Sequence, residues 1–238
     1  MNNCRNCNEL VSSNYCSNCG QPSNLKRIDS HYIIHEIEHI LHVERGILFT
    51  VKALLTRPGK TVQQFIAENR SRLVKPIIFI IITSLIYTFV THLFHIESEL
   101  VDFKGAGESS IDTFLGWMKK NYGYTNLIWG IFIAFWLNIF FRKYDYNFFE
   151  ILILLCFVQG VVMLLYALFV ILQGLTHLHV MQSAAVIGLV YCTWAIGQFF
   201  DKNKIVSYLK AFAAYVLGMI TFLLSLISIG SLIDWLAK

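Results

Sequence analysis

Four cysteines near the start of the chain carry its clearest chemical signal, and they form two closely spaced pairs. Each pair has the spacing C-x-x-C, and eight residues separate the pairs. The four residues are Cys4, Cys7, Cys16 and Cys19. Two thiolates on one tight turn can bind the same metal ion, and two such turns complete a tetrahedral Zn²⁺ site. Residues 1–24 are therefore predicted to form a zinc ribbon whose ion is structural, because four thiolates leave no open coordination position.

A second group of metal-ligating side chains lies in residues 28–44, which an apolar stripe predicts to be an amphipathic helix. The opposite, polar face collects His31, His35, Glu38, His39 and His42. Within it, His35, Glu36 and His39 match H-E-x-x-H, a pattern in which two histidines bind zinc and the glutamate activates water. The extension that supplies a third ligand is absent, so we favour a polar helix face lying along the membrane. A metal-binding or pH-sensing face and a membrane metalloenzyme are the alternatives.

The composition indicates that these groups are attached to a membrane protein. Hydrophobic residues make up 56% of the 238 positions and charged residues only 14%, whereas soluble domains average about 25% charged residues. Five segments approach or exceed the roughly 20 apolar residues that span a bilayer. They lie near 76–95, 125–141, 148–173, 180–200 and 208–233.

Residues 25–75 connect the ribbon to the first span, and they are predicted to form amphipathic helices at the membrane surface. The Arg57-Pro58-Gly59 sequence indicates a turn. Thr61 followed by Gln64 fits a capping box for a helix that runs to about Arg72.

The distribution of positive charge predicts an orientation. If the N-terminus is cytoplasmic, the inner segments carry fifteen Lys and Arg residues and the outer segments carry four. The positive-inside rule therefore favours a cytoplasmic N-terminus and an external C-terminus. A cytoplasmic N-terminus also suits reduced cysteine ligands.

Polar residues in the spans limit the functions that the sequence supports. No Asp, Glu, Lys or Arg falls at the middle of any predicted span, which argues against an ion-coupled carrier. Amide side chains that could join helices by hydrogen bonds are Asn138, Gln159, Gln173, Gln182 and Gln198. The Walker, Rossmann and G-x-S-x-G patterns are missing, so nucleotide-driven and serine-hydrolase chemistry have no supporting motif.

Several short motifs together resemble those of a known bacterial membrane family. In chain order they are Cys4/Cys7, Tyr15 to Gln21, the histidine-rich stretch His35–Gly46, Thr50 to Gly59, Arg70 to Pro76, and Phe148 to Glu150. This order, spread over nearly the whole chain, resembles the family catalogued as domain of unknown function 3667. The resemblance implies a zinc ribbon followed by a multi-span domain in the bacterial inner membrane, and it implies no established activity.

We therefore expect an all-α integral membrane protein with three parts. They are a zinc ribbon at 1–24, cytosolic or interfacial helices at 25–75, and a five-span bundle at 76–238. The leading functional hypothesis is a non-enzymatic membrane protein whose ribbon docks a cytosolic partner or organises an assembly. A channel or transporter subunit for a small solute or lipid is the first alternative, and the metalloenzyme is the second. The expected partners are the bilayer, a cytosolic protein and further copies of the chain, whereas nucleic acid is not expected.

Overall fold

The structure, a computed structural model, describes residues 2–3, 7, 10–11, 14–19, 46–68, 70, 73–94, 96, 110–120 and 122–236. The chain divides into two compact units, Met1–Glu44 and Arg45–Lys238, and each is described by itself.

The described part of the first unit contains two short paired strands. β1 (Asn2–Asn3) and β2 (Leu10–Val11) are antiparallel, with Asn2 opposite Val11 and Asn3 opposite Leu10. The connection between these strands contains Cys7. The ribbon fold as a whole stays a prediction.

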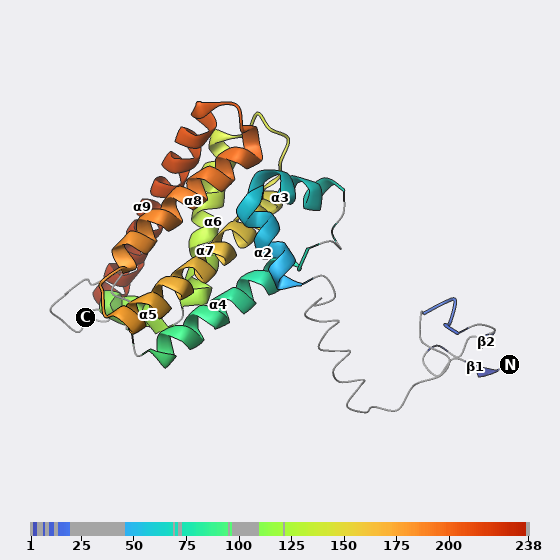
Figure 1. Cartoon of the computed structure of the whole chain (residues 1–238), viewed down its shortest axis with the longest axis horizontal. Coiled ribbons are helices and arrows are strands. Elements are labelled where there is room, and N and C mark those ends of the chain that lie inside the picture. Colours follow the sequence, from blue (N-terminus) through green and yellow to red (C-terminus); the bar gives the residue numbers. More distant parts are fainter. Residues whose placement is uncertain are drawn as a thin grey trace. The chain divides into compact units, whose positions relative to one another are not determined.

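The second unit is helical throughout its described residues (Figure 1). Its helices are α2 (Ile47–Thr56), α3 (Pro58–Ala67), α4 (Pro76–Leu93), α5 (Ser110–Lys120), α6 (Tyr122–Phe140), α7 (Phe148–Thr176), α8 (Met181–Asp201) and α9 (Ile205–Leu236). Four of them are long and apolar enough to cross a membrane, namely α4, α7, α8 and α9. The chain is therefore built as a helical membrane protein.

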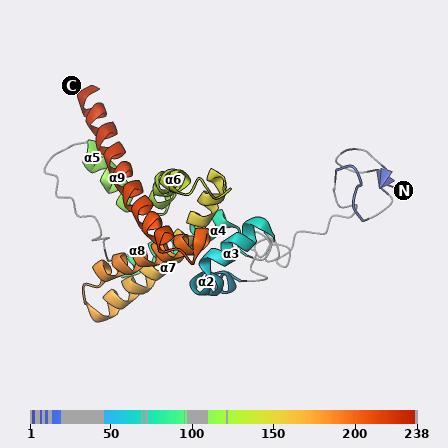
Figure 2. The same ribbon diagram turned by 90° about the horizontal axis from the view of Figure 1, so that it is seen from above.

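α7 is the central helix of this bundle. In its most apolar stretch 67% of the residues are buried, compared with 17% for α9. α7 packs against α4, α6 and α8, and α9 packs against α5, α6 and α8 (Figure 2). Phe157 of α7 is fully buried, and its ring meets those of Phe65 and Phe79 at centroid distances of 5.2 and 5.8 Å. α3 and α4 are thus joined to the centre of the bundle by aromatic packing.

The outer helices present apolar side chains to their surroundings. On α4 the side chains of Ile77, Ile81, Leu85 and Phe89 recur every four residues, and each is 45–69% exposed. Such a continuous apolar stripe would be unfavourable in water and suits contact with lipid.

The fifth predicted span, at 125–141, corresponds to α6. α6 is a helix, but its apolar part, Tyr124–Phe140, is shorter than the four candidate spans. The segment before it, which the sequence indicated only as an external loop, contains α5. α5 lies along α9, and the backbone N–H of Ser110 donates to a carboxylate oxygen of Asp234 at 3.1 Å (Figure 2).

The helix predicted to have Thr61 as its N-cap begins four residues earlier, with Arg57 at the N-cap position. α3 has Pro58 at its first position, and the Arg57 that precedes it makes no side-chain capping bond. Proline is preorganised for the first position of a helix, where its missing N–H is not needed. The hydroxyl of Thr61 instead donates to the carbonyl of Ala53 in α2, at 3.2 Å. The capping-box prediction is therefore wrong, and Thr61 links α3 to α2.

Candidate functional site

Three of the four predicted zinc ligands converge in the first unit. The sulfur atoms of Cys7, Cys16 and Cys19 all lie within 4.8 Å of one another, and those of Cys7 and Cys16 are 3.5 Å apart. Sulfur atoms bound to one tetrahedral Zn²⁺ at about 2.3 Å would be about 3.8 Å apart. Cys16 is buried, whereas Cys19 is exposed. This cluster could hold a metal ion, and Cys4 lies outside the described residues.

The histidine-rich face also lies outside the described residues. Its members are His31, His35, Glu38, His39 and His42, and Glu36 of the H-E-x-x-H match lies outside the described residues as well. Both interpretations that assign them chemistry, the metal or pH-sensing face and the metalloenzyme, stay hypotheses.

The second unit contains a site that the sequence did not reveal, at the place where the α2–α3 pair docks on α8. Gly59, at the start of α3, lies directly against the backbone of Gln198 and Phe199 near the end of α8. A Cβ added to Gly59 would overlap these backbone atoms, so only glycine permits this approach. Two long-range hydrogen bonds secure the contact. Gln63 Nε2 donates to the Phe199 carbonyl at 2.6 Å, and the Tyr191 hydroxyl donates to the Leu54 carbonyl at 3.2 Å.

The same docking explains the motif that runs from Thr50 to Gly59. Thr50 is fully buried, and its hydroxyl accepts a hydrogen bond from the Val74 backbone N–H at 3.2 Å, just before α4 begins. Leu54 is fully buried, and Pro58 begins α3. Thr50, Leu54 and Pro58 of this motif therefore help to position the α2–α3 pair.

A pocket of about 780 Å³ opens beside this contact. Its lining comes from the start of α3 and the end of α8. The lining residues are Arg57, Lys60, Gln63, Gln198, Phe200, Asp201 and Lys202. The volume falls in the range typical of small-ligand sites, about 300–1,000 Å³. The polar lining contains three cationic side chains and one carboxylate.

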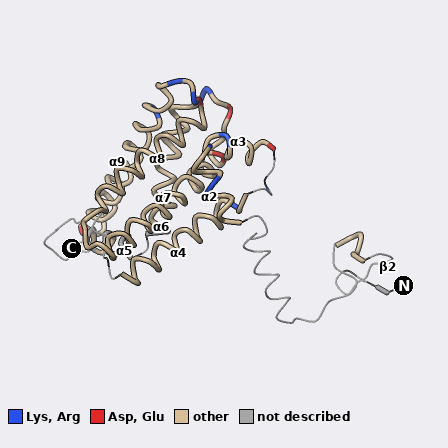
Figure 3. Tube along the Cα trace, viewed as in Figure 1, with Lys and Arg blue, Asp and Glu red and all other residues tan. Residues whose placement is uncertain are grey.

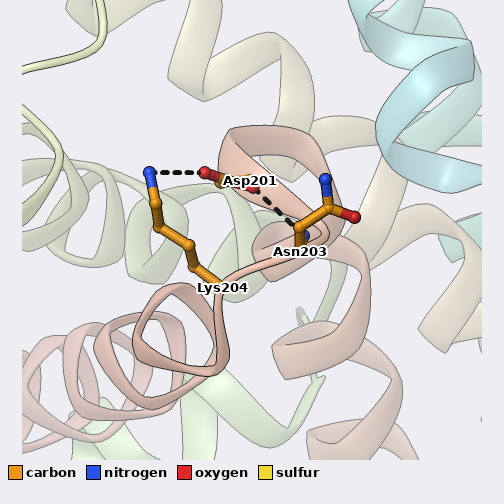
Figure 4. A network of polar contacts seen from close by, with 3 residues as sticks. All are labelled: Asp201, Asn203 and Lys204. Carbon is orange, nitrogen blue, oxygen red and sulfur yellow. Dashed lines mark hydrogen bonds and ion pairs between the residues drawn. The ribbon is translucent and has the colours of Figure 1, made fainter.

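The carboxylate is already engaged on one side of the pocket (Figure 4). Asp201 forms an ion pair with Lys204 at 2.8 Å and accepts a hydrogen bond from the Asn203 backbone N–H at 3.0 Å. The hydrogen bond to Asp201 raises the pKa of Lys204. Within the part of the chain that the structure describes, Arg57, Lys60 and Lys202 form no ion pair. The charge available to a ligand is therefore positive.

Lys and Arg residues gather at the end of the bundle where α8 ends and α9 begins (Figure 3). We call this the basic end of the bundle, and it comprises the starts of α3, α7 and α9 and the ends of α6 and α8. Four of the residues that line the pocket, Gln198, Phe200, Asp201 and Lys202, lie at this end of α8. Phe141, after α6, stacks on Phe200 of α8 with centroids 3.8 Å apart. Lys210 of α9 donates to the Phe140 carbonyl at 3.2 Å. These contacts hold the ends of three helices together beside the pocket.

Tyr146, in the connection from α6 to α7, lies next to the same region. Its ring is 4.5 Å from that of Phe199, centroid to centroid. Burial raises the pKa of Tyr146 above its usual value of 10.0, the Glu150 charge adds to the increase, and a side-chain hydrogen bond with Gln63 opposes it. Tyr146 is therefore a neutral hydrogen-bonding group at neutral pH.

The motif around Phe148 to Glu150 has a structural explanation. The Asn147 side chain accepts from the Glu150 N–H at 3.0 Å, and the Glu150 carboxylate accepts from the Asn147 N–H at 2.9 Å. This reciprocal arrangement is a capping box at the start of α7. Glu150 thus stabilises the beginning of the central helix.

One polar side chain in the bundle interior stands out. Gln159 of α7 is 3% exposed, and neither its amide oxygen nor its amide nitrogen has a hydrogen-bond partner among the described residues. Its amide lies against Gly130 of α6, where an added Cβ would come within 3.2 Å of the oxygen. Asn126, on the same helix as Gly130, donates to the sulfur of Met163 at 3.2 Å. The interior of the bundle therefore contains polar groups as well as apolar ones.

Comparison with known proteins agrees with the resemblance seen in the sequence. Residues 44–88 match the family described as protein of unknown function, DUF3667. No curated protein and no solved structure matches the chain. The matched residues include α2, α3 and most of α4, so the similarity covers the α2–α3 pair that docks on α8 and the segment that carries Arg57 and Lys60.

Proposed function

We propose that this chain is a non-enzymatic protein of the bacterial inner membrane whose N-terminal unit binds one Zn²⁺ and docks a cytosolic protein partner. The observation that supports this proposal is the convergence of the sulfur atoms of Cys7, Cys16 and Cys19 within 4.8 Å. Cys4 is the fourth ligand in the proposal, by its spacing from Cys7. A site with four thiolates is closed to substrates, so the metal stabilises a small recognition surface.

The proposal includes five spans and a cytoplasmic N-terminus. α7 and α9 begin at the basic end. α4 runs in the same direction as α7, because Phe79 lies against Gly160 and Phe94 lies against Gly174. The chain must therefore return to the basic end between α4 and α7. α6 makes this return, because Phe141 directly after it stacks on Phe200 at the end of α8. The 19 residues of α6 extend about 28 Å, close to the thickness of the hydrocarbon layer. The gathering of Lys and Arg at the basic end supports its cytoplasmic placement (Figure 3).

The metal content of the purified full-length protein tests the proposal. We expect one zinc per chain, lost in Cys16→Ser and retained in the neighbouring control Ser17→Ala. Crosslinking in cells should then capture a protein partner with the Ser17→Ala variant but not with the Cys16→Ser variant. An identical metal content in the two variants would contradict the zinc site, and identical crosslinked partners would contradict the docking role. A second metal, lost only in a His35→Ala/His39→Ala double variant, would favour the metalloenzyme hypothesis instead.

A second candidate function, a channel or transporter subunit, is supported by the buried amide of Gln159. An amide buried without a partner is unfavourable, and a water molecule or passing solute would satisfy it. Water permeability of proteoliposomes, followed by light scattering after an osmotic step, tests this alternative. A water permeability above that of protein-free vesicles would support a channel if Gln159→Leu lowers it. A permeability equal to that of protein-free vesicles would count against a channel.

A further inference from the structure

The pocket between α3 and α8 has the chemistry of an anion site. Its three cationic side chains come from two segments that are far apart in the sequence, Arg57 and Lys60 from the start of α3 and Lys202 from the residue after α8. Asp201, the one carboxylate in the lining, is already paired with Lys204. A ligand in the pocket would therefore meet a net positive surface.

We propose that this pocket binds the phosphate group of an anionic ligand. Arginine offers pairs of N–H donors that match phosphate oxygens, and lysine adds a compact positive charge. Gln198 contributes an amide that can hydrogen-bond to a polar ligand, and buried Phe200 provides an apolar wall. The combination suits a phosphate that carries an organic group better than a bare inorganic ion.

The place of the pocket in the fold favours a phospholipid headgroup as the source of that phosphate. The pocket opens at the end of α8, a candidate span, and in the arrangement of spans proposed above, on which the choice of a lipid rests, that end lies at the depth of the headgroups. Basic pockets at the ends of membrane helices on the cytoplasmic side are a recurring way to bind anionic lipids. A soluble phosphate ester presents the same chemistry and is the other source that the experiment must distinguish.

The pocket is held in shape before any ligand arrives. The close approach of Gly59 to the α8 backbone fixes the distance between its two sides, and the 2.6 Å bond from Gln63 to the Phe199 carbonyl fixes their orientation. Preorganised groups lose less conformational freedom on binding, so a modest number of charges can give measurable affinity.

Native mass spectrometry of the full-length protein in a neutral detergent tests the proposal. The probes are dioleoyl-phosphatidylglycerol, which is anionic, and dioleoyl-phosphatidylcholine, which has no net charge. The pocket variant is Arg57→Gln/Lys60→Gln/Lys202→Gln, and the control, Lys52→Gln/Lys75→Gln/Lys143→Gln, removes the same charge at exposed lysines outside the pocket lining. A cation near an anionic headgroup contributes about fivefold to affinity, so the pocket variant should bind phosphatidylglycerol about 100-fold more weakly.

The outcomes separate the two sources of phosphate and decide the proposal. Preference for phosphatidylglycerol, lost in the pocket variant and kept in the control, supports a headgroup site. Displacement of that lipid by millimolar glycerol 3-phosphate but not by glycerol supports a site for soluble phosphate esters. Equal binding of phosphatidylglycerol to the two triple variants overturns the proposal. If the triple variant does not fold, the single change Lys202→Glu on the exposed residue after α8 decides the same question, with Lys143→Glu as its control.

Discussion

Replacement of Gly59 by alanine is the sharpest test of how the α2–α3 pair is held. The added methyl group would overlap the backbone of Gln198 and Phe199, which cannot turn aside as a flexible side chain can. If α3 stays in place, overpacking of this kind costs about 1–3 kcal/mol. If α3 moves away, it loses the bonds from Gln63 and Tyr191, each contributing about 1 kcal/mol. The two responses together place the loss of docking free energy at about 1–3 kcal/mol, or roughly 5- to 150-fold.

Hydrogen exchange measured by mass spectrometry follows this docking directly. The protection of backbone amides in α2 and α3 against exchange should fall by that factor in Gly59→Ala, while the amides of α7 keep theirs. Gly116→Ala is the matched control, because an added Cβ at Gly116 in α5 meets nothing within 4 Å. Alanine at position 116 should leave the protection of the amides in α2 and α3 unchanged and make α5 slightly more stable. Unchanged exchange in α2 and α3 of Gly59→Ala would refute the backbone contact.

Two further changes test the central helix, both by thermal unfolding of the detergent-solubilised protein. Asn147→Ala removes the capping box of α7 and should destabilise the protein by about 1 kcal/mol, and an unchanged melting temperature would show that the cap contributes nothing. Gln159→Leu replaces a buried amide without a described partner by an apolar group of similar size, so the melting temperature should rise. A fall would instead show that the amide has a partner such as a bound water.

Much of the helical architecture could be predicted because the signal is local. A run of apolar residues long enough to cross a bilayer is visible in the sequence alone, and four of the five predicted spans correspond to helices that meet that length. The cysteine pairs are equally local, and their spacing predicted the convergence of three thiols. The fifth span stays a prediction, because α6 is short and its role depends on where its neighbours begin and end.

Other features could not be predicted, either because two local signals competed or because the residues involved lie far apart in the sequence. Pro58 competed with the Thr61 capping box and determined where α3 begins. α5 was not predicted from the sequence, although Phe114 and Met118 recur with helical spacing. The pocket brings Arg57 and Lys202 together through packing, and no pattern along the chain connects residues so far apart.

The docking of α2 and α3 on α8 also sets an order for the assembly of the protein. Leu54 and Gln63 are synthesised early, but their partners Tyr191 and Phe199 follow 137 and 136 residues later. Until α8 has been inserted, the α2–α3 pair lacks the docking surface that α8 provides. The apolar side chains that are buried in the docked pair, such as Leu54, must until then be accommodated by the bilayer surface or by a chaperone. The docking contact therefore forms late, and it can form only in a chain whose α8 has already been inserted.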